Sequence, residues 1–179
     1  MIKDIEKVLL TEEQIVKRAK EMGNEISNDY KGKDLLIVGI LKGSVVFASE
    51  LIKNITIPTE IDFMAVSSYG NSSETTGVVR ILKDLDHSIE GKDIIIVEDI
   101  IDSGVTLDYL LKYLKARKAN SIEIVTLLTK PARRKVDINV KYCGFEVPDE
   151  FLVGYGLDYA EKYRNLPYVG ILKEEVYKK

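Results

Sequence analysis

Three features that define many other protein classes are scarce or absent in this chain: cysteine, histidine and long apolar runs. The 179 residues include one cysteine, Cys143, which excludes an intrachain disulfide and favours a reducing compartment. One cysteine and one histidine, His87, cannot form a Cys/His metal cluster. No apolar run reaches transmembrane length, and the charged residues 1–10 lack the apolar core of a signal peptide. We therefore expect a cytoplasmic protein that has no membrane partner.

An excess of positive charge is also absent. The chain has 26 Lys and Arg residues against 29 Asp and Glu residues, so its formal net charge is −3. This balance argues against broad electrostatic binding to nucleic acid. The length fits one domain, residues 1–179, and is sufficient for a substantial hydrophobic core.

Short apolar runs alternate along the chain with helical patterns. The runs at 35–41, 94–97 and 121–129 have no polar alternation, which is typical of strands buried on both faces of a parallel sheet. Further strands are expected at 60–68, 78–83, around Val140 and Tyr142, at 151–153 and at 168–172. Helices are expected at 11–28, which opens with a capping-box pattern, at 45–53 and from about 107 to 116. The alternation predicts an α/β fold with a mostly parallel central sheet flanked by helices.

The segment 94–107, IIIVEDIIDSGVTL, contains the strongest functional signal. Its apolar run ends in Glu98 and Asp99, and the residues from Asp102 to Thr106 lead into a helix. The free N–H groups at a helix start bind phosphate, and ligands of parallel sheets bind beyond the carboxyl ends of the strands. Carboxylates beside a phosphate would repel it unless a metal ion or a sugar hydroxyl lies between them. The segment therefore predicts a substrate with a phosphate at one end and a diol or metal beside it. An exposed loop with solvated acids is the alternative.

Two common nucleotide-binding patterns are incomplete in this chain. A P-loop needs Gly-Lys followed by Ser or Thr, and neither Gly32-Lys33 nor Gly91-Lys92 is followed by either residue. Gly154 begins a dinucleotide fingerprint, but that pattern fails because position 159 is tyrosine.

The segment 94–107 resembles the phosphoribosyl pyrophosphate (PRPP) signature of type I phosphoribosyltransferases, and the chain resembles the hypoxanthine-guanine phosphoribosyltransferases among them. Other motifs of that family follow in the same order: LKGS at 41–44, Ser68-Tyr69 before a polar segment, TKPAR at 129–133 and DEFLVGYGLDYAEKYRNLPYVGIL at 149–172. The resemblance covers residues 11–172. It implies the type I fold, with a small hood formed by terminal segments and a flexible hairpin lid. It also implies a homodimer or a homotetramer.

The resemblance implies purine salvage with Mg²⁺: the 5-phosphoribosyl group passes from PRPP to N9 of hypoxanthine or guanine, giving IMP or GMP and pyrophosphate. In the family Asp102 would be the general base at purine N7, although aspartate is also a preferred helix N-cap. Residues implied for the ribose and phosphate of PRPP are Glu98, Asp99, Asp102, Ser103, Gly104, Val105 and Thr106. Residues implied for pyrophosphate are Leu41, Lys42, Gly43 and Arg164.

The remaining implied roles concern the purine, the metal and the lid. Lys130 would donate to O6 and so favour 6-oxopurines over adenine. Residues implied for the purine are Lys130, Phe151, Leu152 and Asp158; those for Mg²⁺ are Glu98, Asp99 and Asp158; those for the lid are Ser68 and Tyr69. The alternatives are a solvated surface charge for Arg164, a core aromatic for Phe151 and an ordinary hairpin tip for the polar segment 69–77.

Two other functions fit parts of the same pattern. An RNA-binding regulator, similar to the pyrimidine-operon attenuation proteins, would need a clustered basic face, and Arg133-Arg134-Lys135 is the compact basic cluster in the sequence. An enzyme that prefers xanthine or a pyrimidine is the alternative within the enzyme class. Side-chain identity does not determine the preference among hypoxanthine, guanine and xanthine, because backbone carbonyls near Leu152 and Asp158 would contact the 2-position.

Overall fold

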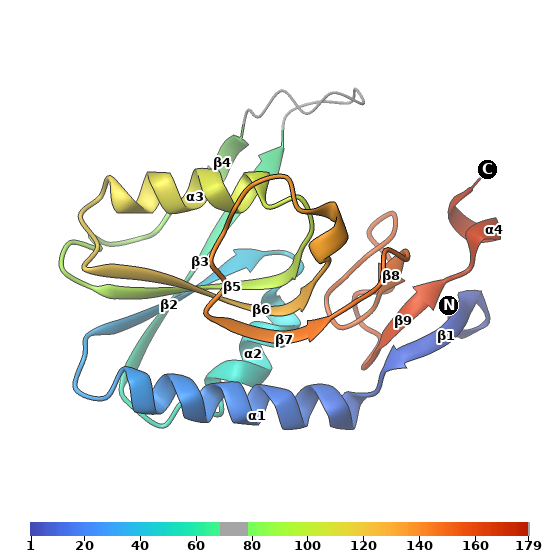
Figure 1. The fold of residues 1–179 in the computed structure, drawn as a ribbon, viewed down its shortest axis with the longest axis horizontal. Coiled ribbons are helices and arrows are strands. Elements are labelled where there is room, and N and C mark those ends of the chain that lie inside the picture. The colour runs from blue at the N-terminus through green and yellow to red at the C-terminus, as the bar shows by residue number, and fades with distance from the viewer. Residues whose placement is uncertain (69–78, 179) are drawn as a thin grey trace.

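The central sheet has the order β4-β3-β2-β5-β6-β7 in this computed structural model, which describes residues 1–68 and 79–178 (Figure 1). All neighbouring pairs are parallel except β3 and β4, so the prediction of a mostly parallel sheet is confirmed. The strands are β2 (Leu35–Leu41), β3 (Thr59–Ser68), β4 (Val79–Lys83), β5 (Asp93–Ile101), β6 (Ser121–Thr129) and β7 (Tyr142–Glu146).

Helices cover both faces of this sheet. The helices α1 (Glu12–Asp29) and α2 (Val45–Ile52) pack on one face, and α3 (Val105–Lys115) packs on the other. Successive side chains of a strand point to opposite faces. Ile37 and Ile95 therefore join the core beneath α1 and α2, whereas Leu36 and Ile94 join the core beneath α3. Both sets are buried, which explains why these strands show no polar alternation.

The first helix begins at the predicted capping box. Gln14 N donates to Thr11 Oγ1 at 3.3 Å, and Thr11 N donates to Gln14 Oε1 at 2.9 Å. Two backbone donors that the helix itself cannot satisfy are bonded in this way.

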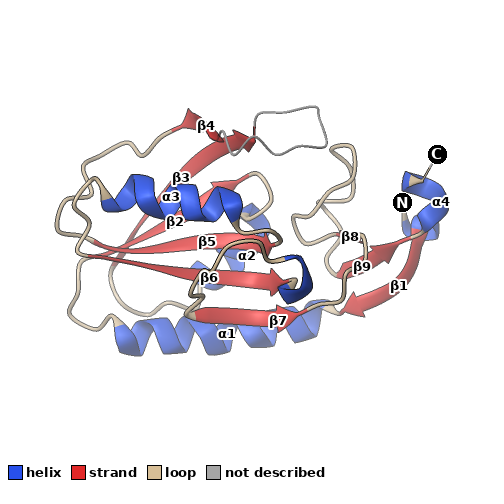
Figure 2. Cartoon of the chain, turned by 45° about the horizontal axis from the view of Figure 1, so that its top comes forward, coloured by secondary structure: helices blue, strands red, loops and turns tan. Residues whose placement is uncertain are grey.

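A second, smaller sheet lies at one end of the molecule (Figure 2). It has the order β1-β9-β8, with β1 (Ile5–Leu10), β9 (Val169–Leu172) and β8 (Leu152–Val153), and the short helix α4 (Glu174–Tyr177) follows it. This sheet joins both ends of the chain and confirms the expected hood. The strand β1 was not predicted, because half of its residues are exposed and its strand form depends on pairing with β9.

The predicted lid follows β3. Ser68 ends β3 as expected, and β3 pairs antiparallel with β4. Tyr69 and the rest of the predicted lid, residues 69–77, lie outside the described residues. Among the helices within residues 1–68 and 79–178, none has the length and apolar character needed to cross a membrane.

Candidate active site

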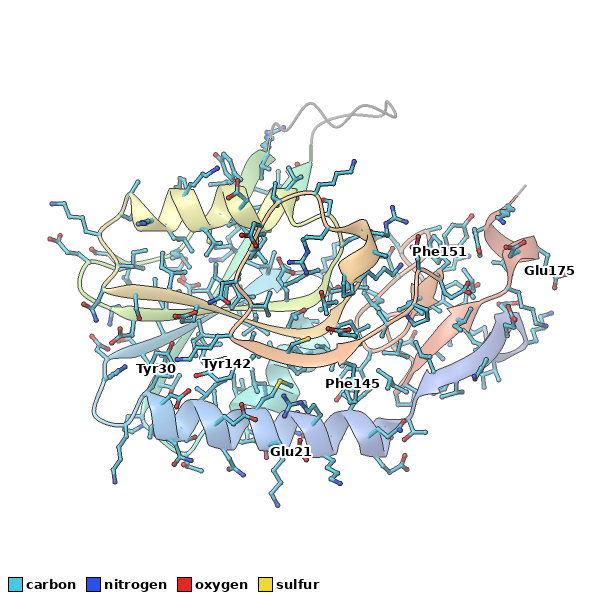
Figure 3. All side chains as sticks on the ribbon, viewed as in Figure 1. Glu21, Tyr30, Tyr142, Phe145, Phe151 and Glu175 are labelled. Atoms are coloured by element: carbon cyan, nitrogen blue, oxygen red, sulfur yellow. The ribbon has the colours of Figure 1, made fainter. Side chains whose placement is uncertain are left out.

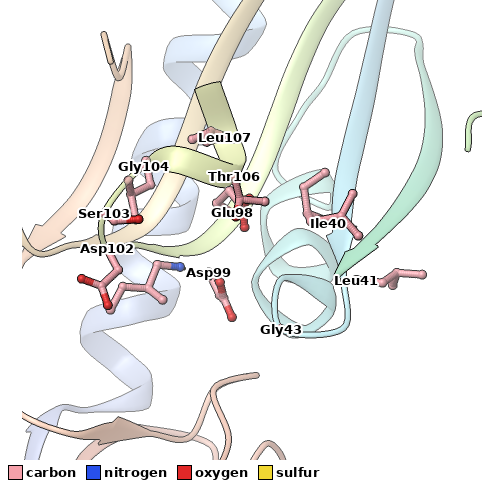
Figure 4. A pocket seen from close by; sticks show the side chains of 13 residues that line it. Ile40, Leu41, Gly43, Glu98, Asp99, Asp102, Ser103, Gly104, Thr106 and Leu107 are labelled. Atoms are coloured by element: carbon pink, nitrogen blue, oxygen red, sulfur yellow. Dashed lines mark hydrogen bonds between the residues drawn. The ribbon is translucent and has the colours of Figure 1, made fainter. Parts of the chain in front are cut away.

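The sheet order creates a crevice between β2 and β5. The chain leaves β2 to form β3 on one side, whereas β5 pairs with the other side of β2. Ligands of open α/β sheets bind at such switch points, beyond the carboxyl ends of the strands. A cavity of about 290 Å³ lies there, and Figure 4 looks into it. Its lining includes the predicted residues Leu41, Gly43, Glu98, Asp99, Asp102, Ser103, Gly104 and Thr106.

Glu98 and Asp99 lie on β5 itself, which corrects the expectation that the strand ends at residue 97. β5 continues to Ile101 because its backbone remains paired with β6 as far as Thr129. Burial, together with the neighbouring Asp99 charge, holds the pKa of Glu98 well above its usual range. Burial also raises the pKa of Asp99 to about 6, although the N–H of Ile100 and the charge of Arg164 oppose that rise. Two adjacent carboxylates that resist ionisation favour a cationic ligand.

The loop after β5 leads directly into the first turn of α3. Gly104 has a φ of +83°, a conformation that glycine adopts readily, and it is the N-cap of α3. The interpretation of Asp102 as the N-cap is therefore wrong. Val105 N donates to Ser103 Oγ at 3.3 Å, and both Ser103 and Thr106 line the cavity. The loop therefore brings two hydroxyls to the cavity at a helix start, the kind of position where proteins bind phosphate.

The turn after β2 packs against Asp99 and against the hood. The Leu41–Lys42 peptide bond is cis. A Cβ atom on Gly43 would overlap the Asp99 carboxylate, and a Cβ atom on Gly156 would overlap the Gly43 carbonyl. The turn after β2, the strand β5 and the hood segment at Gly156 therefore meet where the two glycines have no side chain.

Arg164 extends this contact on the hood side. Its Nη1 donates to Gly156 O at 2.8 Å, and its Nη2 lies 3.1 Å from Asp158 Oδ1 and 3.3 Å from Glu161 Oε1. Its side chain is 25% exposed, so the interpretation as a solvated surface charge is wrong. Glu161 also pairs with Lys42 Nζ at 2.8 Å, which joins the hood to the turn after β2.

A second cavity of about 570 Å³ adjoins the first and shares Ile100 and Asp102 with it. The four predicted purine residues, Lys130, Phe151, Leu152 and Asp158, all line it. Lys130 is buried, and its Nζ donates to Glu150 O at 2.7 Å. The Phe151 ring lies between the central sheet and α4, as Figure 3 shows. It stacks on Tyr177 with 4.6 Å between ring centroids.

Several residues that line the second cavity were not predicted, among them Arg133, Asp149 and Tyr177. Arg133 and Asp149 lie inside motifs that suggested the family, but nothing in their sequence context indicated that they meet. Tyr177 follows the part of the chain that the resemblance covers. Its place is set by the hood, which brings α4 beside Phe151.

No group of three or more His, Cys, Asp or Glu side chains is arranged to hold a metal ion among residues 1–68 and 79–178. The carboxylates at Glu98 and Asp99 nevertheless provide the oxygen ligands that Mg²⁺ prefers. Mg²⁺ commonly uses one or two carboxylates and takes its other ligands from substrate phosphates and water. The donor set therefore fits Mg²⁺ when a phosphorylated substrate completes the site.

The fold and its paired cavities define a phosphoribosyltransferase. The family model described as "Phosphoribosyl transferase domain" matches residues 7–160. The hypoxanthine-guanine phosphoribosyltransferase of Bacillus subtilis is 59% identical over 174 residues, covering 97% of each chain. The enzyme of the same name from Staphylococcus aureus is 58% identical over 177 residues, covering 99% of each chain.

Solved structures agree with these relatives. A hypoxanthine phosphoribosyltransferase from Staphylococcus aureus has a TM-score of 0.97 and 57% identity, covering 100% of this chain and 97% of that one. A hypoxanthine-guanine phosphoribosyltransferase from Bacillus anthracis has a TM-score of 0.91 and 49% identity, covering 94% and 99%. The chain belongs to the phosphoribosyltransferase family, in its hypoxanthine-guanine group.

Proposed function

We propose that the protein transfers the 5-phosphoribosyl group of PRPP to N9 of hypoxanthine and of guanine, releasing pyrophosphate, in purine salvage. One observation supports this most directly: the cavity lined by acids and a phosphate-type loop shares Asp102 with a cavity lined by Lys130 and Phe151. A sugar phosphate in the first cavity would thus lie beside a planar base in the second. The names of the similar enzymes agree with this proposal.

PRPP would bind across the first cavity. The N–H groups and hydroxyls of Ser103 and Thr106 would hold the 5′-phosphate at the start of α3. Glu98 and Asp99 would hold the ribose hydroxyls. Their negative charge would also stabilise the positive charge that develops on the ribosyl group, an interaction that strengthens in the transition state and so increases the rate.

Pyrophosphate would leave between the turn after β2 and the hood. The backbone of Leu41, Lys42 and Gly43 would donate to its oxygens, and the Arg164 guanidinium suits bidentate contact with phosphate. Glu98, Asp99 and Asp158 would hold Mg²⁺. When bound, Mg²⁺ supplies positive charge that neutralises the leaving pyrophosphate.

The base would bind in the second cavity. Lys130 would donate to the purine O6, and its bond to Glu150 O fixes the direction of its ammonium group. Asp102 would accept the proton of purine N7 as general base. Phe151 would stack on the purine ring, and the Leu152 backbone would contact the purine edge. Tyr177 stacks on the Phe151 ring.

An initial-rate assay tests the proposal. The protein would be supplied with PRPP, Mg²⁺ and one of five bases: hypoxanthine, guanine, xanthine, adenine or uracil. We expect nucleotide formation with hypoxanthine and guanine, little with adenine and none with uracil. Nucleotide formation with only uracil or only xanthine, or with none of the five bases, would contradict the proposal. Cytoplasmic location and a dimer or tetramer remain predictions of the family resemblance.

RNA binding is disfavoured by the surroundings of the basic cluster. Arg133 pairs with Asp102 and Asp149, and Arg134 donates to Thr129 Oγ1 at 2.7 Å. Two of the three cations are therefore directed at neighbouring protein groups. Filter binding to RNA across a salt series would separate the functions, because a regulator requires a steep loss of affinity with salt.

A further inference from the structure

Arg133 joins the proposed general base to a second acid of the purine cavity. It ends the 3₁₀ turn Pro131–Arg133, which follows Lys130 at the end of β6. Its Nε lies 2.6 Å from Asp102 Oδ1, and its Nη1 donates to Asp149 Oδ1 at 3.2 Å. One guanidinium thus lies against two carboxylates from different parts of the chain.

Asp149 extends the contact to Lys130. The Oδ1 atom that accepts from Arg133 lies 3.8 Å from Lys130 Nζ. The four groups Asp102, Arg133, Asp149 and Lys130 therefore form a row of alternating charge along one side of the cavity. The two ends of this row are the groups proposed to contact N7 and O6, which are neighbouring atoms of one purine edge.

Folding stability does not account for this row. The side chains of Arg133, Asp102 and Asp149 are 51%, 46% and 53% exposed, and ion pairs this exposed contribute only about 0–1 kcal/mol. The hydrogen bond to Asp149, followed by the charge of Asp102, raises the pKa of Arg133, so the guanidinium stays charged.

Arg133 covers one oxygen of the Asp102 carboxylate. Asp102 Oδ1 is buried, with Arg133 Nε 2.6 Å from it, whereas the Asp102 side chain as a whole is 46% exposed and lines the cavity. The side of the carboxylate away from Oδ1 is therefore the part that a purine could reach.

We propose that Arg133 is a positioning residue that holds Asp102 and, through Asp149, Lys130 at the spacing of purine N7 and O6. The inference rests on the proposed function. Arg133 itself contacts neither atom. It makes the two recognition groups act as a unit, because a shift of either end would misplace the other.

Steady-state kinetics of R133A, D149N and a control, K115A, test the inference. Lys115 is exposed on α3, and K115A removes the same charge away from both cavities. We expect R133A to lower kcat with hypoxanthine by about 10–100-fold, the scale of a misplaced catalytic group, while the KM for PRPP changes less than about twofold. We also expect R133A to lower the preference for hypoxanthine over adenine in kcat/KM.

D149N separates the two halves of the row. It removes the acid that Arg133 and Lys130 share but leaves the contact between Arg133 and Asp102. We therefore expect D149N to raise the KM for hypoxanthine and to lower the preference over adenine, with a smaller loss of kcat than in R133A.

Three outcomes would overturn the inference. In the first, R133A and D149N have the same kinetic parameters as K115A. In the second, R133A lowers kcat/KM equally for all bases, and in the third, R133A mainly raises the KM for PRPP. Thermal melting of each variant excludes misfolding, which is not expected for side chains about half exposed. If the unaltered protein forms no purine nucleotide, the proposed function itself fails, and that result is distinct from all three.

Discussion

The carboxylate of Asp99 occupies the space where a side chain on Gly43 would begin. A Cβ atom built on Gly43 would lie well under 3.0 Å from Asp99 Oδ2, a separation that real Cβ atoms essentially never show. The turn after β2 therefore contacts Asp99 on β5 through the backbone of Gly43, with no side chain between them. Because both residues line the first cavity, the proposed pyrophosphate and ribose contacts have a fixed relative position.

We expect G43A to reduce phosphoribosyl transfer by about 10²-fold or more, because the new methyl group must displace either Asp99 or the turn. The control is G91A: Gly91 has open space around its Cβ but a φ of +78°. G91A should lose about 1–2 kcal/mol of stability and keep its activity. Rate assays and denaturant unfolding of both variants would measure the contrast, and full activity in G43A would contradict it.

D102N should lower turnover by about 10²–10⁴-fold, the usual contribution of general acid–base catalysis, with little change in the KM for PRPP. An amide cannot accept the N7 proton, whereas the phosphate contacts remain. The control is D34N. Asp34 is an exposed acid that immediately precedes β2, so it lies at the amino ends of the strands, away from the cavities, and it pairs with Lys92. Turnover of D102N equal to that of D34N would rule out the proposed base.

K130M should lower the preference for hypoxanthine over adenine by about 10–100-fold. A hydrogen bond to a charged donor contributes about 1.5–3 kcal/mol, and each 1.4 kcal/mol is tenfold in affinity. Methionine keeps the length of the buried side chain but cannot donate to O6. Competition between the two bases would measure the ratio, with K115M as the exposed control. A preference that survives in K130M would show that another group selects the base.

The stability of the protein should depend on pH through Asp99. The folded protein holds the pKa of Asp99 at about 6, against an ordinary value of 3.8. Between these values the folded state binds more protons than the unfolded state, so stability falls as pH rises through this window. At most about 3 kcal/mol is lost by this group once the pH exceeds its folded pKa.

D99N removes this group, so its stability relative to the unaltered protein should increase between about pH 4 and 6. Denaturant unfolding across pH, in chelator and without substrates, gives the difference directly. A difference that does not change between pH 4 and 7 would show that Asp99 is not destabilised by burial.

The strands of the central sheet and two strands of the hood, β8 and β9, could be predicted within a few residues, whereas the hood strand β1 could not. Leu35–Leu41 and Ser121–Thr129 are bounded in the structure as in the sequence prediction, because both faces of these strands are covered and the apolar run is continuous. Ile5–Leu10 is a strand only because β9 pairs with it, and no local pattern reports that partner. The extent of β5 was missed for a similar reason, because pairing with β6 continues past its acids.

The sequence by itself determined the order of the motifs and the chemistry available at each: acids and a small-residue loop after one strand, a lysine before a proline after another. These depend on residue type and short spacing. Only the tertiary structure decided that Asp102 faces Arg133, that Gly43 abuts Asp99 and that Tyr177 stacks on Phe151. Such contacts join segments far apart in the chain. The order of the strands and the closure of the hood determine them, and no local pattern of residues contains that information.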